Sequence, residues 1–245
     1  MDIAWMTARP IAHRGLHDDA RPENSLAAFA AGMEAGYPLE LDVHLTRDNE
    51  LVVVHDENLK RVTGQDLKIT DCPRETWRAL KLCGTEEGIP TLDEVLALVD
   101  GRVGLIIEIK KDRCRKIGQL EQKLVDRLHR YNGPFVLKSF DPRVVGWMRR
   151  HAPEFFCGQL SDGFRNGKYT PVFSWFMRNL HMIRFNHAQF ISFNARALPN
   201  AAVTRWHKEK GLPLLCWTIR SQEEADRAKG LGADNIIFEN FVPKE

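Results

Sequence analysis

The sequence lacks any apolar run long enough to cross a membrane, because no stretch approaches the ~18 uncharged residues that a transmembrane helix needs. Residues 1–10 also lack an apolar run of the length found in signal peptides. The five cysteines are odd in number and widely scattered, which suits a reducing compartment better than a disulfide framework. The formal charge is only +2, without the basic excess of a nucleic-acid surface. We therefore expect a cytoplasmic protein with no nucleic-acid partner and no stable membrane insertion.

Nothing in the middle of the chain has the composition of a linker, and no internal repeat or low-complexity tract is visible. The 245 residues, 43% of them hydrophobic, are enough for one large domain with a sizeable core. We expect a single domain over residues 1–245. Two segments interrupt its regular pattern, namely a small excursion at 57–90 and an aromatic-rich segment at 161–187.

Apolar runs that read as strands alternate with helical signatures along most of the chain. The candidate parallel strands end near residues 13, 43, 109, 139, 160, 193, 218 and 238. Helices are expected at 24–35, 91–99, 117–131, 142–150, 200–210 and 221–230, with a short one at 73–80. Eight such units in a chain of this length favour an α/β fold of the (β/α)8 TIM-barrel type over an open sheet.

The stretch 40–56 combines acidic residues with two strand signals. Glu40 and Asp42 stand at i and i+2 in an apolar run, so on a strand both carboxylates point to one face. Two carboxylates this close repel each other unless a cation lies between them, and a hard metal ion is the simplest choice. After a turn signal at 47–49, the run 51–54 is too close for a parallel crossover. The sequence therefore predicts an antiparallel hairpin extension after the second strand, with His55 roughly opposite Glu40.

In TIM barrels the chemistry lies at the carboxyl ends of the strands. Candidates from several strands fall there: His13, Glu40, Asp42, Glu108, Lys110 and Trp217. Each alone has a simpler interpretation, since a lone histidine is usually structural and Glu108 with Lys110 can be a local ion pair. For Trp217, packing is about as good an explanation as substrate contact. Their convergence on one rim favours a functional site.

Short motifs also occur in an order that resembles the glycerophosphodiester phosphodiesterase family over residues 10–241. These motifs are His13-Arg14-Gly15, Pro22-Glu23-Asn24-Ser25, Glu40-x-Asp42, Val54-His55-Asp56, Ile107-Glu108-Ile109-Lys110, Ser139-Phe140 and Trp217-Thr218. The resemblance implies a phosphodiesterase barrel with one divalent metal ion, Mg²⁺ or Ca²⁺, and two histidines that flank the scissile phosphate. Carried over by position, it implies metal ligands at Glu40, Asp42 and Glu108, an acid/base pair at His13 and His55, and phosphate or substrate contacts at Arg14, Lys110 and Trp217.

Two rim positions depart from the family pattern. The asparagine that usually follows the tryptophan strand is replaced, with Arg220 two residues after Thr218. The usual Thr-Asp-x-Pro close is Phe238-Glu239-Asn240-Phe241. These departures alter the rim where the alcohol group of a substrate is expected, and they leave the metal and histidine set untouched.

The resemblance implies hydrolysis of glycerophosphodiesters to sn-glycerol 3-phosphate and an alcohol, with a small-molecule substrate as the partner. The residue types fit, because a phosphodiester needs positive charge on its non-bridging oxygens, a base for the nucleophile and an acid for the leaving alkoxide. The alternatives are a lysophospholipase D-type hydrolase and a catalytically silent barrel used for binding. The aromatic stretch 173–185 is interpreted first as packing, with a lid or a lipid-contacting surface as alternatives.

Overall fold

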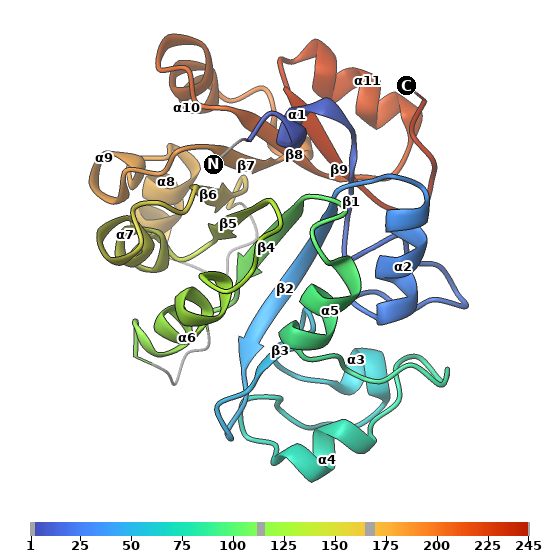
Figure 1. Cartoon of the computed structure of the whole chain (residues 1–245). Coiled ribbons are helices and arrows are strands. Elements are labelled where there is room, and N and C mark those ends of the chain that lie inside the picture. Colours follow the sequence, from blue (N-terminus) through green and yellow to red (C-terminus); the bar gives the residue numbers. More distant parts are fainter. Residues whose placement is uncertain (1–2, 112–115, 165–169, 245) are drawn as a thin grey trace.

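The computed structural model describes residues 3–111, 116–164 and 170–244, which form one sheet closed into a barrel with helices around its outside (Figure 1). Eight of its strands are parallel: β1 (Ile11–Ala12), β2 (Leu39–Leu45), β4 (Leu105–Ile109), β5 (Phe135–Ser139), β6 (Cys157–Ser161), β7 (Ile191–Asn194), β8 (Leu214–Ile219) and β9 (Asn235–Phe238). Pairing of β1 with both β2 and β9 closes the barrel. The (β/α)8 TIM-barrel prediction is therefore confirmed.

The ninth strand, β3 (Leu51–Val53), lies antiparallel on the outer edge of β2, so the predicted hairpin extension is confirmed. Val43 pairs with Val53, and the N–H of Val54 donates to the carbonyl of Asp42 at 3.0 Å. Continued by one residue, this register brings His55 level with Leu41, one position from the predicted partner Glu40. The hairpin thus delivers His55 beside the strand that carries the acidic pair.

Helices connect the strands, and several of them begin at residues that cap helices well. Among the longer ones are α2 (Leu26–Glu34), α5 (Leu92–Val99), α6 (Gln119–Leu128), α7 (Pro142–His151) and α11 (Gln222–Gly230). Their N-caps include Thr91, which forms a capping box with Glu94, and Asp141, which precedes a proline in the first helical turn. The helix expected at 200–210 is α10 (Ala201–Thr204), which continues as a π-helical segment over Arg205–Glu209. A short α1 (Trp5–Ala8) precedes the barrel.

Strand alternation divides the side chains of the barrel between two environments. On β2, Leu39, Leu41 and Val43 join the large apolar cluster under the surrounding helices. Inside the barrel, a second cluster contains Met6, Ile11, Ile106, Val136, Phe190, Leu215 and Ile237. Because Ile106 and Glu108 are two residues apart on β4, they share the inner face. The residues that alternate with the outer apolar ones on β2 therefore point into the barrel as well.

The two predicted interruptions contain short helices. Residues 57–90 include α3 (Lys60–Thr63) and α4 (Arg74–Ala79), close to the helix expected at 73–80, and enclose a small apolar cluster around Trp77. Within 161–187, α8 (Pro171–Arg178) and α9 (Ile183–Asn186) lie between β6 and β7, and residues 165–169 fall outside the described part. Strand–helix alternation therefore continues through a segment in which the sequence pattern did not show it.

Candidate active site

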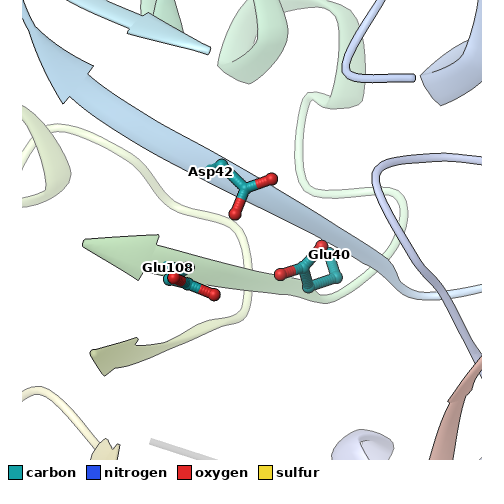
Figure 2. A group of neighbouring side chains, drawn as sticks. All are labelled: Glu40, Asp42 and Glu108. Atoms are coloured by element: carbon teal, nitrogen blue, oxygen red, sulfur yellow. The ribbon is translucent and has the colours of Figure 1, made fainter. Parts of the chain in front are cut away.

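Three carboxylates from two neighbouring strands meet inside the barrel (Figure 2). Glu40 and Asp42 project from β2 and Glu108 from the neighbouring β4, where Asp42 and Glu108 are register partners. One potential ligand atom from each residue lies within 4.8 Å of the others, and each residue is at most 5% exposed. Burial of the outer apolar face of β2 forces the alternate acidic side chains inward, so the local pattern and the fold agree.

Two lysine ammonium groups balance these carboxylates. Nζ of Lys110 lies 2.8 Å from Oδ1 of Asp42 and 2.6 Å from Oε1 of Glu108. Nζ of Lys138, on β5, lies 2.8 Å from Oε1 of Glu40 and 3.7 Å from Oε2 of Glu108. Burial alone would raise the pKa of Glu40 and of Asp42, but Lys138 and Lys110 respectively hold these pKa values below their ordinary range. Glu40 and Asp42 are therefore ionised at neutral pH.

The cluster has the donor chemistry of a hard divalent cation, because all of its ligand atoms are carboxylate oxygens. Within the described residues, Oε1 of Glu40 and Oδ1 of Asp42 receive no hydrogen bond of good geometry, although each lies 2.8 Å from a lysine ammonium group. Elsewhere in the described chain no other set of three or more potential metal ligands gathers as closely. A buried Glu/Asp/Glu cluster that can bind a metal is thus a property of the fold.

The turn after β1 brings a guanidinium group to the same carboxylates. The backbone N–H of Arg14 donates to Oε2 of Glu40 at 3.1 Å, and Nε of its side chain lies 3.4 Å from Oδ2 of Asp42. Arg14 has φ 56° and Gly15 has φ 81°, and a Cβ at Gly15 would lie 2.8 Å from the carbonyl carbon of Ala28. Glycine is thus required at this position. Left-handed backbone at an arginine is uncommon and is typical of functional sites.

Asn24, just before α2, holds the carboxylate of Asp42. Its Nδ2 donates to Oδ2 of Asp42 at 2.9 Å, and it too has a positive φ, of 58°. The helix is capped by Ser25, whose hydroxyl accepts from the N–H of Ala28. Ser25 thus caps the helix, whereas the preceding Asn24 contacts Asp42.

His13, directly after β1, lies between two carboxylates. Its Nδ1 hydrogen-bonds to Oε2 of Glu239, and its Nε2 lies 3.9 Å from Oε2 of Glu40. Because a carboxylate can only accept, Nδ1 carries the proton and Nε2 is the nitrogen that faces the acidic cluster. Burial would raise the pKa of Glu239, but the hydrogen bond from His13 and the nearby His17, whose Nε2 lies 3.7 Å from Oε2 of Glu239, lower it. Nη2 of Arg220 lies 2.7 Å from its Oε1.

His55 is held by a chain of charged contacts that leads back to the cluster. Its Nδ1 donates to Oδ1 of Asp56 at 2.8 Å, and Oδ2 of Asp56 accepts from Nε of Arg61 at 2.6 Å. Arg61 donates to both carboxylate oxygens of Glu23, at 2.8 and 2.7 Å. Glu23 also accepts from Nη1 of Arg14 at 2.8 Å. Both candidate acid/base histidines therefore donate Nδ1–H to a carboxylate that is itself held by an arginine.

A cavity of about 870 Å³ opens beside these residues. Its charged end contains His55, Glu108 and Lys110. Its apolar end is lined by Ile109, Ile117, Phe140, Phe164, Phe173 and Met177. The last two belong to α8, so the aromatic-rich segment forms part of the cavity wall.

The structure brings most of the predicted site residues into one network. His13, Arg14, Glu40, Asp42, Glu108 and Lys110 contact one another, and His55 joins through the charged chain described above. Trp217 is half-buried and packs edge-to-face on Phe140, with ring centroids 5.6 Å apart. In the described chain Phe140, and not Trp217, lines the cavity.

Sequence reasoning missed several residues that hold the network together, namely His17, Arg61, Lys138 and the role of Glu239. A signal existed for Lys138, because a lysine inside the apolar run 135–139 is unusual for a buried strand. No comparable signal existed for Arg61, whose partners are 5 and 38 residues away. Such pairings require the tertiary structure.

The chain is similar in sequence and in fold to known proteins. The sequence model of the glycerophosphoryl diester phosphodiesterase family matches residues 13–242. A glycerophosphodiester phosphodiesterase of Caldanaerobacter subterraneus subsp. tengcongensis is 32% identical, covering 94% of this chain and 93% of that protein. A lysophospholipase D of Rattus norvegicus is 26% identical, covering 94% of this chain and 82% of that protein. A phosphodiesterase of Oleispira antarctica, solved with its product sn-glycerol-3-phosphate, has a TM-score of 0.77 at 24% identity over 94% and 91% of the two chains.

Proposed function

Since this chain belongs to the glycerophosphoryl diester phosphodiesterase family and is by that membership a phosphoric diester hydrolase, we propose that it cleaves glycerophosphodiesters to sn-glycerol 3-phosphate and an alcohol. The observation that carries the proposal is the meeting of three buried carboxylates, two oriented histidines and two basic side chains at one rim. All of the predicted site residues lie within the matched range 13–242.

Glu40, Asp42 and Glu108 are the proposed ligands of one divalent ion, Mg²⁺ or Ca²⁺, both of which prefer oxygen ligands. When bound, the ion supplies positive charge to the non-bridging phosphate oxygens. Arg14 and Lys110 are the proposed protein contacts of the same oxygens. Burial would lower the pKa of each, but the neighbouring carboxylates, Asp42 foremost, raise it. Both side chains therefore stay cationic.

His13 and His55 are the proposed general acid/base pair. The Nδ1–H of each ring is directed to a carboxylate, Glu239 or Asp56, so Nε2 is available to take up or deliver a proton. One ring removes the proton of the nucleophile and the other protonates the leaving oxygen. The nucleophile is water or the hydroxyl group next to the phosphate. Trp217 stays a proposed substrate contact, because it packs on Phe140, which lines the cavity.

The test is release of sn-glycerol 3-phosphate from glycerophosphocholine, measured with added Mg²⁺ or Ca²⁺ and with a chelator. Chelation should abolish turnover, and His13→Ala and His55→Ala should each reduce it by ~10²–10⁴-fold while the circular dichroism spectrum is unchanged. His129→Ala is the matched control, because His129 is an exposed histidine that pairs with Glu154 at the surface. Turnover that survives the chelator, or near-normal turnover in either active-site variant, would contradict the proposal. No turnover under any condition would favour the silent barrel.

A second candidate, a lysophospholipase D-type hydrolase, is favoured by the apolar end of the cavity. That end is lined mainly by aliphatic and aromatic side chains and adjoins the charged end, so it can accept an acyl chain beside a phosphodiester. Phe173→Ser should reduce turnover of lysophosphatidylcholine about tenfold and spare that of glycerophosphocholine. Equal effects on both substrates would count against the acyl-chain interpretation.

The cytoplasm remains the proposed compartment. The described cysteines, at positions 72, 83, 157 and 216, are all free thiols, which suits a reducing environment. None of the described helices is both long enough and apolar enough to cross a bilayer.

A further inference from the structure

Solvent-exposed apolar side chains gather on α8 and α9. Among the described residues, five large hydrophobic side chains are exposed, and four of them lie there: Val172, Phe173, Trp175 and Phe185, at 77, 41, 52 and 73%. The fifth is Val242 near the C-terminus. We call the surface formed by these four residues the α8–α9 face. Single exposed apolar residues are ordinary, but a cluster of them marks an interaction site.

The segment that carries the α8–α9 face contains basic residues and no acidic ones. No aspartate or glutamate occurs between Asp162 and Glu209 in the sequence, whereas Arg178 and Arg184 lie in α8 and α9. The neighbouring α7 adds Arg149 and Arg150, whose side chains donate to backbone carbonyl groups. Within the described chain none of these four arginines forms an ion pair, so their positive charges are not cancelled locally.

A second cavity, of about 570 Å³, lies between α7 and the α8–α9 segment. Arg143, Arg149 and Arg150 line it together with the apolar side chains of Phe176, Met182 and Phe185. Arg143 is also paired with Asp141, so the uncompensated positive charge of this cavity comes from Arg149 and Arg150. Guanidinium groups bind phosphate oxygens in a bidentate manner, and an apolar wall beside them suits hydrocarbon. This combination matches an anionic amphiphile.

The same helix serves both cavities. Phe173 and Met177 of α8 line the catalytic cavity, whereas Phe176 lines the second one. In Figure 1, α7, α8 and α9 lie together on one side of the barrel. A ligand held at the second cavity would therefore lie across α8 from the proposed site of hydrolysis.

We propose that the α8–α9 face docks this protein onto the surface of a membrane that contains anionic phospholipid. Apolar side chains with a basic surround are the features by which peripheral proteins bind such surfaces. A symmetric pairing of two copies through this face fits less well, because each face would meet an identical one. With no carboxylate between residues 162 and 209, arginines would oppose arginines across that contact.

The test is co-sedimentation of the full chain with vesicles of phosphatidylcholine alone or mixed with phosphatidylglycerol. Binding should require phosphatidylglycerol and weaken as salt is added, because salt screens the arginine charges. The apolar variant Trp175→Ser/Phe185→Ser and the basic variant Arg149→Gln/Arg150→Gln should each bind at least tenfold more weakly. Val242→Ser and Lys60→Gln are the matched controls, since they change an exposed valine and an exposed lysine outside the face.

Hydrolysis of soluble glycerophosphocholine reports folding of the variants, because neither Trp175 nor Phe185 lines the catalytic cavity. If wild type shows no such hydrolysis, circular dichroism reports folding instead, so failure of the proposed activity leaves the docking test intact. No binding to phosphatidylglycerol vesicles, equal binding to both vesicle types, or equal binding by the variants would overturn the docking proposal. So would light scattering that shows a dimer which Trp175→Ser/Phe185→Ser dissociates, since a second copy would then occupy the face.

Discussion

The ammonium nitrogen of Lys138 lies 2.8 Å from Oε1 of Glu40, and both residues are almost completely buried in the barrel. Lys138 comes from β5 and Glu40 from β2, with β4 between them in the sheet. The same ammonium group is 3.7 Å from Oε2 of Glu108. The buried ammonium group of Lys138 therefore faces two of the three proposed metal ligands and supplies them with positive charge from the protein.

Lys138→Met should destabilise the metal-free protein strongly. Removing one partner of a buried ion pair leaves an uncompensated charge, which costs about 3–5 kcal/mol. Unfolding by urea in the presence of a chelator measures this loss. Added Mg²⁺ or Ca²⁺ should reduce the difference in free energy of unfolding between the variant and wild type, because the cation places positive charge beside Glu40. Lys123→Met, at an exposed position of α6, is the control and should change stability by less than about 0.5 kcal/mol. A Lys138→Met protein as stable as wild type in chelator would contradict this account.

Glu239→Gln should change how stability depends on pH. Burial alone would raise the pKa of Glu239, but the hydrogen bond from His13 and the charge of nearby Arg220 override this effect, so the folded-state pKa lies below the unfolded value of about 4.3. Such a group stabilises the fold above the unfolded pKa, and its contribution is lost as the pH falls through the folded pKa. The variant should therefore be less stable than wild type by about 1.5–3 kcal/mol at pH 6. The difference should shrink toward pH 3, and a pH-independent difference would be the contrary result.

Arg61→Gln should lower turnover about tenfold without preventing folding. Arg61 holds both Asp56, which orients His55, and Glu23, which contacts Arg14. Outer partners of this kind typically contribute 10–100-fold. Steady-state kinetics should show the loss in kcat, with a smaller change in KM.

The matched control for Arg61→Gln is Arg78→Gln. Arg78 is a similarly exposed arginine of the 57–90 excursion, and it pairs with Glu94 outside the network. Equal kinetic losses in both variants would show that the effect of Arg61 is on the stability of the excursion and not on the site.

Cys157 and Cys216 should resist alkylation in the native protein. Burial raises the pKa of each thiol to about 12, and the thiolate is the reactive form. At pH 8, iodoacetamide followed by peptide mass spectrometry should detect modified Cys83, which is exposed, and unmodified Cys157 and Cys216. In urea both buried thiols should react. Rapid native modification of either one would show that its strand opens locally.

The strand–helix order of the barrel and the acidic pair on β2 could be predicted from the sequence because their signals are local. Glu40 and Asp42 are two residues apart, and strand geometry alone puts them on one face. The caps Thr91 and Asp141 act within three residues of themselves. The segment 161–187 shows the limit of such patterns, because the apolar residues of α8 are partly exposed and its periodicity does not mark a buried helix. Within the stretch 173–185, interpreted first as packing, Met177 and Ile183 are buried, whereas Trp175 and Phe185 are exposed.

The amino-acid sequence by itself determined the elements, their order and the polar residues at the strand ends, since each depends on neighbours a few positions away. Only the tertiary structure decided which of those residues meet. Closure of the barrel brings β1 beside β9, and so joins His13 to Glu239 across 226 residues of sequence. Two departures from the family pattern, Arg220 and Glu239, become an ion pair in the same way. The pairing of buried charges is long-range because compensation requires proximity in space, which no local spacing encodes.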